Sequence, residues 1–168
     1  MLLPCMAAAQ QQYTGDTMVV VPIEKIASRI YENADTTIVV ITKKNFIKIP
    51  STGTSITSFA KNKIIDRIVI VSTTADGVFA EEYYIDKGAL VFVFQSFEYF
   101  NEVQVDNPRN FRGMKFWECR YYLEEDKVLC ETYTGKKEKT LNYTAKELIE
   151  QGKKVKAYLT GYLGGRYN

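Results

Sequence analysis

Residues Val78–Gln95, VFAEEYYIDKGALVFVFQ, predict a β-hairpin around which the rest of the chain is organised. Ala80–Ile85 and Ala89–Phe94 are rich in aromatic, aliphatic and β-branched residues, which suit a pleated, half-buried surface. Between them lies the segment Asp86–Gly88, in which the aspartate favours the start of a turn and the glycine accepts a positive φ. We therefore expect a type I turn followed by a bulge at this position.

A second copy of this pattern follows the first. We expect strands at Phe116–Leu123 and Lys127–Thr134, on either side of the turn Glu124–Asp126. An aspartate in the second copy takes the place of the glycine in the first, although aspartate enters the left-handed region less readily. The matching positions of the two copies are Tyr83 and Tyr121, Tyr84 and Tyr122, Gly88 and Asp126, and Leu90 and Val128.

Further strands are predicted on both sides of the first hairpin. Ile64–Thr73 is followed by the turn residues Thr74–Gly77, so it forms a meander with the hairpin. Thr37–Ile41 and Asn45–Ile49 predict another hairpin, whereas Pro50–Lys61 is rich in Ser, Thr and Gly and is expected to be a loop. With the helices described next, these strands predict an α+β fold whose twisted, mainly antiparallel sheet has about five to seven strands.

Two helices are expected to pack on this sheet. Pro22–Asn33 begins with a proline, which suits the first helical position, and has apolar residues at the spacing of one helical face. Thr144–Leu159 begins with a capping box formed by Thr144 and Glu147. Gly152 in the middle of this second helix indicates close packing, because glycine costs about 1 kcal/mol relative to alanine there.

The ends of the chain are expected to lie outside the folded domain, residues 22–160. Residues 1–9 end in three alanines, which is typical of the cleavage site of a signal peptide. Residues 10–21 are expected to be a polar linker followed by a short β-like run, and residues 161–168 a flexible tail. The sequence therefore predicts a periplasmic or extracellular protein, and a cytoplasmic protein with a frayed N-terminus is the alternative.

The pattern Tyr-Tyr-x-x-x-Gly-x-Leu at Tyr83–Leu90 resembles one found in uncharacterised secreted bacterial proteins. These proteins carry tandem hairpins of this kind behind an N-terminal helix. The resemblance covers roughly Pro22 to Thr134 and rests on a turn signature. It implies the same fold and an exported protein, and it implies no activity.

Composition narrows the possible functions. The chain has 168 residues, of which 46% are hydrophobic and 25% charged, as expected of one globular domain. The net charge is +2, and pairs such as Lys153-Lys154 are interpreted as solvated, which argues against a nucleic-acid partner. No apolar run approaches the roughly 20 residues that span a bilayer. Histidine is absent, which excludes Ser-His and Cys-His catalysis and removes the commonest zinc ligand, so we expect no metal or other cofactor.

Cys119 and Cys130 lie on the two strands of the second hairpin. One register places them directly opposite each other and gathers the apolar residues on one face, whereas the alternative places Cys119 opposite Glu131. Burial favours the first register, in which the two sulfur atoms are close enough to bond. We expect a disulfide if the protein is exported and two buried thiols if it is cytoplasmic.

The acidic residues predict no catalytic pair. Glu81 and Glu82 are neighbours on one strand, so their side chains project to opposite faces of the sheet. Glu118 and Arg120 lie two residues apart and project together, beside Glu131 or Leu129 of the neighbouring strand, which predicts a cross-strand ion pair. A histidine-free hydrolase that uses carboxylates is therefore the alternative to a binding function.

Aromatic residues make up 13% of the chain and give the stronger functional indication. Tyr84 and Tyr122 hold equivalent places near the two turns, where they line a groove or simply pack across the strands. Large aromatic residues and arginine commonly anchor interfaces. We expect a non-catalytic binding or scaffold module that binds a protein or glycan of the bacterial cell envelope through an aromatic sheet face or the loop 97–113. The candidate binding residues are Tyr84, Trp117, Arg120, Tyr122, Phe111 and Arg112.

Overall fold

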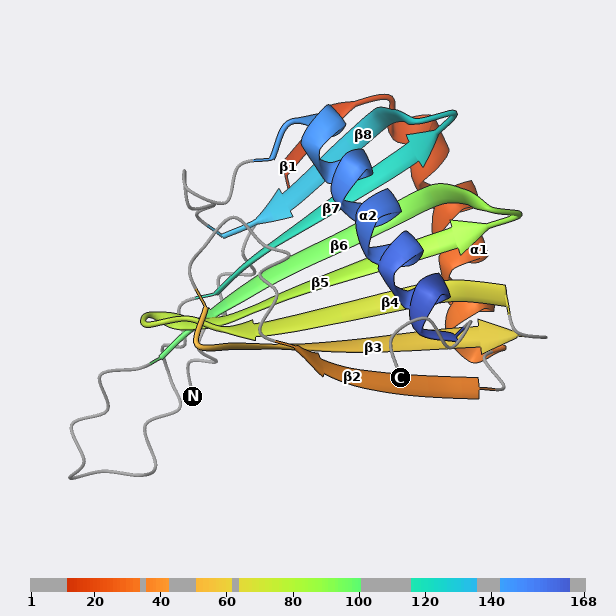
Figure 1. Cartoon of the computed structure of the whole chain (residues 1–168). Coiled ribbons are helices and arrows are strands. Elements are labelled where there is room, and N and C mark those ends of the chain that lie inside the picture. Colours follow the sequence, from red (N-terminus) through yellow and green to blue (C-terminus); the bar gives the residue numbers. More distant parts are fainter. Residues whose placement is uncertain are drawn as a thin grey trace, which may run out of the picture.

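The computed structural model describes residues 12–33, 36–42, 51–61, 64–100, 116–135 and 143–163. These residues form a single sheet of eight strands with a long helix on each face (Figure 1). The spatial order of the strands is β1-β8-β7-β6-β5-β4-β3-β2, and every neighbouring pair is antiparallel. The predicted α+β class with a mainly antiparallel sheet is confirmed.

From β2 to β8 the strands follow one another in chain order, so the sheet is a meander with β1 added at one edge. Strand β6 contributes buried residues to the core on both faces of the sheet, Val93 on one and Phe92 on the other. The strands are β1 (Gln12–Gly15), β2 (Thr36–Thr42), β3 (Gly53–Lys61), β4 (Ile64–Thr73), β5 (Gly77–Asp86), β6 (Ala89–Tyr99), β7 (Phe116–Glu124) and β8 (Lys127–Thr134). The helices are the 3₁₀ helix η1 (Thr17–Val19), α1 (Val20–Glu32) and α2 (Ala145–Leu163).

Helix α1 carries the chain from β1 at one edge of the sheet to β2 at the other edge, across one face (Figure 1). It buries Ile23, Ala27 and Ile30, which belong to the predicted apolar stripe. The helix begins two residues earlier than predicted. Among the described residues, no helix is both long and apolar enough to cross a membrane.

Helix α2 crosses the opposite face (Figure 1). The predicted capping box is present, because the backbone N–H of Thr144 donates to Glu147 at 2.7 Å and that of Glu147 donates to Thr144 Oγ1 at 3.3 Å. Gly152 lies over the ring of Tyr83, and a Cβ atom added there would come within 2.9 Å of Tyr83 Cδ1. The glycine thus lets the helix approach the sheet closely. The apolar side chains that α2 buries are Leu148, Ile149, Val155 and Leu159.

Both predicted hairpins are present, and their turns share one geometry. Each turn has two central residues with positive φ, Lys87 (49°) and Gly88 (88°) in the first and Glu125 (48°) and Asp126 (60°) in the second. Two such residues define a type I′ turn, whose twist matches that of the flanking strands. The expected type I turn is therefore wrong. Instead, the register of each hairpin shifts near the turn, between Tyr84 and Ile85 in the first and between Tyr122 and Leu123 in the second. The residue without an opposite partner lies on the strand after the turn, Val91 in β6 and Leu129 in β8.

The turn of the second hairpin has two residues, Glu125 and Asp126, instead of the three predicted. With the register shift, this changes the pairing of the two strands, so the predicted pairing of the cysteines is wrong. Cys119 lies opposite Tyr133, and Cys130 lies opposite Tyr122. Cys119 packs in the core beneath α2, whereas Cys130 packs in the core beneath α1. Side chains on opposite faces of a sheet cannot form a disulfide, and both cysteines are free thiols.

The predicted loop at Pro50–Lys61 is also wrong, because Gly53–Lys61 is strand β3. Its buried residues alternate strictly, but two of them, Thr54 and Ser58, carry hydroxyl groups that hide the period of two in the sequence. Thr54 Oγ1 forms a hydrogen bond of 3.1 Å with Ser72 Oγ on β4. Strand β2 pairs with β3. Its predicted hairpin partner, residues 45–49, lies outside the described residues.

The N-terminal boundary of the folded part lies before the predicted residue 22. The expected linker contains β1, which pairs with β8, and the expected β-like run at 17–21 is η1 and the start of α1. Asp16 caps η1, since its Oδ1 accepts a hydrogen bond from the backbone N–H of Met18 at 2.9 Å. At the other end, α2 continues to Leu163. The signal-peptide prediction for residues 1–9 and residues 164–168 of the predicted tail fall outside the described residues.

Candidate binding site

Three aromatic side chains form a row across the sheet beneath α1. Tyr84, Phe92 and Tyr122 lie opposite one another on β5, β6 and β7, with neighbouring ring centroids 5.3 Å apart. Tyr84 is 7% exposed and Tyr122 is fully buried. Their hydroxyl groups donate to Glu82 at 2.8 Å and to Glu24 of α1 at 2.9 Å, respectively. The two predicted binding tyrosines therefore lie in one row, but much of their surface packs against α1.

A groove of about 320 Å³ opens beside this aromatic row. Tyr84 and Phe92 contribute to its wall from the sheet. The other lining residues come from α1, and they are Glu24, Ala27, Ser28, Tyr31 and Glu32. This groove, called the α1 groove below, is the place where the predicted binding residue Tyr84 borders open space.

The remaining predicted binding residues do not join the row. Trp117 is fully buried on the α2 face, where its ring centroid lies 6.1 Å from that of Phe79. Arg120 lies on the α1 face and forms an ion pair at 2.9 Å with Glu118 of its own strand, whereas a cross-strand pair was predicted. The sheet thus divides the predicted set between its two faces. Outside the described residues lie Phe111 and Arg112.

A buried carboxyl group that the sequence did not single out lies beneath α2. Glu81 is fully buried, and its Oε1 accepts a hydrogen bond from Gln95 Nε2 at 2.6 Å. Its Oε2 accepts from the Tyr83 hydroxyl at 3.0 Å and from Gln151 of α2 at 3.3 Å. Burial raises the pKa of Glu81 from 4.5 to about 7, although these donors and Tyr143 favour the charged form. Glu81 therefore connects the sheet to α2 in the interior of the protein.

The hydrogen bonds around Glu81 continue across the α2 face. The hydroxyl of Tyr121 donates to Gln95 Oε1 at 3.1 Å. On the same face, the thiol of Cys119 donates to Glu131 Oε1 at 3.3 Å. These contacts explain how polar groups are accommodated beneath a helix, since buried polar atoms need partners.

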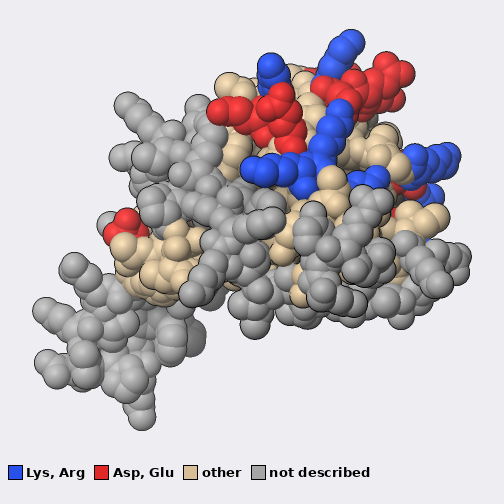
Figure 2. Space-filling view, viewed as in Figure 1, with Lys and Arg blue, Asp and Glu red and all other residues tan. Residues whose placement is uncertain are grey.

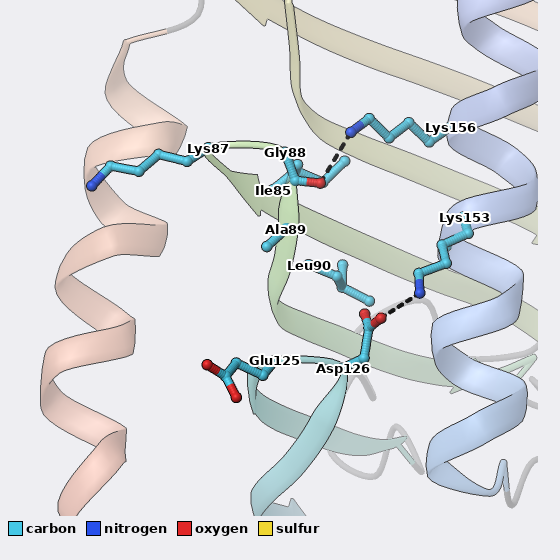
Figure 3. A pocket seen from close by; sticks show the side chains of 10 residues that line it. Ile85, Lys87, Gly88, Ala89, Leu90, Glu125, Asp126, Lys153 and Lys156 are labelled. Carbon is cyan, nitrogen blue, oxygen red and sulfur yellow. Dashed lines mark hydrogen bonds and ion pairs between the residues drawn. The ribbon is translucent and has the colours of Figure 1, made fainter.

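A pocket larger than the α1 groove lies where the two hairpin turns meet α2. This pocket, called the hairpin–helix pocket below, has a volume of about 600 Å³ (Figure 3). Ile85 and Leu90, which are 3% and 7% exposed, supply apolar surface at its floor. Gly88 in the first turn and Gly152 in α2 also line it, and a Cβ atom at Gly88 would meet no atom within 4 Å. The repeated hairpin thus builds the pocket, because both of its turns end beside the same helix.

Two lysines of α2 cross the mouth of this pocket, and each reaches a different turn (Figure 3). Lys153 forms an ion pair with Asp126 in the second turn, and Lys156 donates to the carbonyl oxygen of Gly88 in the first turn at 3.2 Å. Lys87 and Glu125 also line the pocket, but their side chains point away from α2 (Figure 3). The charge of Lys153 is therefore balanced by a carboxylate, whereas Lys156 contacts a neutral acceptor and retains two N–H donors.

The pocket combines features that sequence reasoning did not connect. The sequence predicts that Lys153 is solvated, and it indicates no role for Lys156. The available signal was the spacing of Gly152, Lys153 and Lys156, which places a small residue and two cations on one side of a helix. Only the tertiary structure determines that this side of α2 faces the two hairpin turns.

Elsewhere on the side that carries α2, charges of both signs are mixed over the described surface (Figure 2). Among the described residues, no group of three His, Cys, Asp or Glu side chains is placed to hold a metal ion.

No protein-family model, no curated protein and no solved structure matches this chain.

Proposed function

We propose that this protein is a non-catalytic binding module and that the hairpin–helix pocket holds its ligand, a small anion with an apolar body. The observation that carries the proposal is the position of the Lys156 ammonium group. It lies at the mouth of a pocket of about 600 Å³ and donates there only to the neutral carbonyl of Gly88 among the described residues. Its charge is available to a ligand.

The charges around the pocket support an anionic ligand. Three lysines line it against two carboxylates, those of Glu125 and Asp126. Asp126 already pairs with Lys153. A carboxylate or phosphate group could accept hydrogen bonds from Lys156 at little cost, because its own oxygen atoms would replace water around that ammonium group.

The floor of the pocket supports an apolar body for the ligand. Ile85 and Leu90 present aliphatic surface next to the two glycines. The volume lies within the range of roughly 300 to 1,000 Å³ that is common for small-molecule sites. A short alkyl chain that covers Leu90 would remove apolar area from water and contribute about 25 cal/mol per Å².

We also propose that the protein acts in the cell envelope. Ala7-Ala8-Ala9 has the small-residue form that signal peptidase cleaves, and this supports export. Mass spectrometry of the natively expressed protein should find an N-terminus near Gln10. Intact Met1 on protein recovered from the cytoplasm would contradict export without affecting the pocket.

Calorimetric titration with octanoate tests the binding proposal, with 1-octanol as a probe that lacks the carboxylate. We expect octanoate to bind more tightly than 1-octanol. Lys156→Gln should weaken octanoate binding by about tenfold or more, because a hydrogen bond to a charged group contributes about 1.5–3 kcal/mol. Lys154→Gln is the matched control, since it removes the same charge from the same helix at a position that does not line the pocket.

The proposal would be wrong if octanoate failed to bind. It would also be wrong if Lys156→Gln and Lys154→Gln weakened binding equally, since this would show attraction to the general charge of α2. Circular dichroism of both variants establishes that α2 remains folded.

A further inference from the structure

We propose that the outer edge of β2 pairs with β2 of a second copy of this chain, so that two sheets join into one. Strand β2 is the last strand in the order β1-β8-β7-β6-β5-β4-β3-β2, and it pairs only with β3 among the described residues. Its outer side therefore presents backbone N–H and C=O groups without a neighbouring strand in the described part of the chain. A strand of another molecule is the partner that satisfies such a row of groups.

The sequence of β2 lacks the devices that usually protect an edge strand. Charged residues, proline and bulges keep natural edges from pairing with other chains. Thr36–Thr42, TTIVVIT, contains no charged residue and no proline, and all seven residues are β-branched. Its pairing with β3 runs without a register shift, whereas the next pair, β3 with β4, contains one at Phe59/Ala60. The outer edge of β2 is thus regular over its whole length.

The opposite edge of the sheet, formed by β1, is shorter and ends in a bend. Strand β1 has only four residues and ends at Gly15, which has a φ of 94°. A Cβ atom at this position would lie 2.2 Å from the carbonyl oxygen of Leu129. The chain turns away there into η1, so β1 offers a short edge. The two ends of the sheet are therefore not equivalent, and the seven-residue edge of β2 is the one suited to pairing.

A second copy fits this edge because the pairing is compatible with two-fold symmetry. A two-fold axis normal to the sheet makes the two β2 strands antiparallel and keeps the same face of each sheet on the same side. Directly opposed residues share a face, so one residue must lie opposite its own copy. Full overlap of Thr36–Thr42 places Val39 on the axis and Thr36 opposite Thr42 of the second copy. Every opposed pair then joins two uncharged β-branched residues, which favour strands.

This arrangement also explains why the partner is a second copy rather than a basic or acidic peptide. The edge itself offers no charge that would select a charged segment. In the symmetric pair, each chain supplies the same neutral strand, and both α2 helices lie on the same side of the joined sheet. The hairpin–helix pocket lies at the turns of β5–β8 and does not include β2, so self-association and ligand binding are independent.

Light scattering coupled to size-exclusion chromatography tests the pairing with the full chain. We expect a dimer at micromolar concentration. Val39→Lys should raise the dissociation constant at least tenfold, because it places two positive charges opposite each other on the axis. Val71→Lys is the matched control: Val71 is 37% exposed on β4, a strand with neighbours on both sides, so this variant should remain a dimer.

A cysteine variant keeps the proposal testable if Val39→Lys fails to fold. Opposed residues in an antiparallel pair have Cα atoms roughly 4.5–5.5 Å apart, which suits a disulfide. Val39→Cys should therefore form a covalent dimer on mild oxidation, and Val71→Cys should not. A monomer at 100 μM, a dimer that persists in Val39→Lys, or the absence of a Val39→Cys cross-link in a dimer would each overturn the proposal. So would capture of an extended peptide by a chain that stays monomeric.

Discussion

Replacing Glu81 with glutamine should stabilise the protein at neutral pH and remove part of the pH dependence of its unfolding. Glu81 is fully buried beneath α2, and burial raises its pKa from 4.5 to about 7. Glutamine has nearly the same shape and stays neutral. The hydroxyl of Tyr83 can rotate and the amide of Gln151 can turn over, so both can accept a hydrogen bond from the new amide.

The sign of the effect follows from the two pKa values. Because the folded-state pKa of Glu81 is the higher one, the folded state binds more protons than the unfolded state between pH 4.5 and about 7. The contribution of Glu81 to the free energy of unfolding is therefore most favourable below pH 4.5. It decreases as the pH rises to about 7. At about 1.4 kcal/mol for each unit of pKa, the full decrease is about 3 kcal/mol.

Urea unfolding at several pH values between 4 and 8 measures this effect. The difference in the free energy of unfolding between Glu81→Gln and the original chain should move by about 3 kcal/mol in favour of the variant over this range. Glu150→Gln removes an exposed carboxylate from α2 and controls for the loss of a negative charge. Parallel curves for Glu81→Gln and the original chain would refute the reasoning, since the carboxyl group would then have the same charge in both states.

Two further predictions concern the packing of the sheet. Gly152→Ala should lower the free energy of unfolding by about 1–3 kcal/mol, because the new methyl group meets the ring of Tyr83. Urea titration measures this change, and a variant more stable than the original chain would show that α2 lies farther from the sheet. Cys119 and Cys130 should both react with an alkylating reagent in denaturant without reductant, as peptide mapping would reveal, because they lie on opposite faces of the sheet. If both thiols reacted only after a reductant was added, the two cysteines would form the disulfide that the sequence predicted.

Much of the fold could be predicted because local signals agreed with the tertiary structure. The two hairpins combine β-branched and aromatic strands with turn residues, and α2 begins at a capping box. Gly152 indicated a close approach that the structure confirms against Tyr83. In these segments, short-range chemistry and packing favour the same structure.

Other elements could not be predicted because the deciding contacts are distant in the chain. Buried hydroxyl groups of Thr54 and Ser58 hid the alternation of β3, and Thr54 has its partner on β4. The register of the second hairpin depends on a type I′ turn without glycine, with Asp126 at a φ of 60°. A change in register by an odd number of residues exchanges the faces of a strand. Cys119 lies opposite Tyr133, three residues from its predicted partner Cys130, so the two cysteines are on opposite faces.

The candidate site was the part least accessible from the sequence. Aromatic residues beside turns indicated a binding face, but helix α1 packs against Tyr84 and Tyr122. The hairpin–helix pocket is assembled from three segments, and no one of them carries a binding motif. Its defining contacts, from Lys153 to Asp126 and from Lys156 to Gly88, join residues 27 and 68 positions apart.

Titration of the ¹⁵N-labelled protein with octanoate, followed by amide nuclear magnetic resonance, tests the proposed site most directly. Gly88 in the first turn and Gly152 in α2 both line the hairpin–helix pocket, and glycine amides occupy a well-separated region of the spectrum. We predict that these two signals and that of Lys156 shift together and saturate with one dissociation constant. Shifts that gather instead at Ala27 and Tyr84, in the α1 groove, or that fail to saturate, would contradict the proposed function.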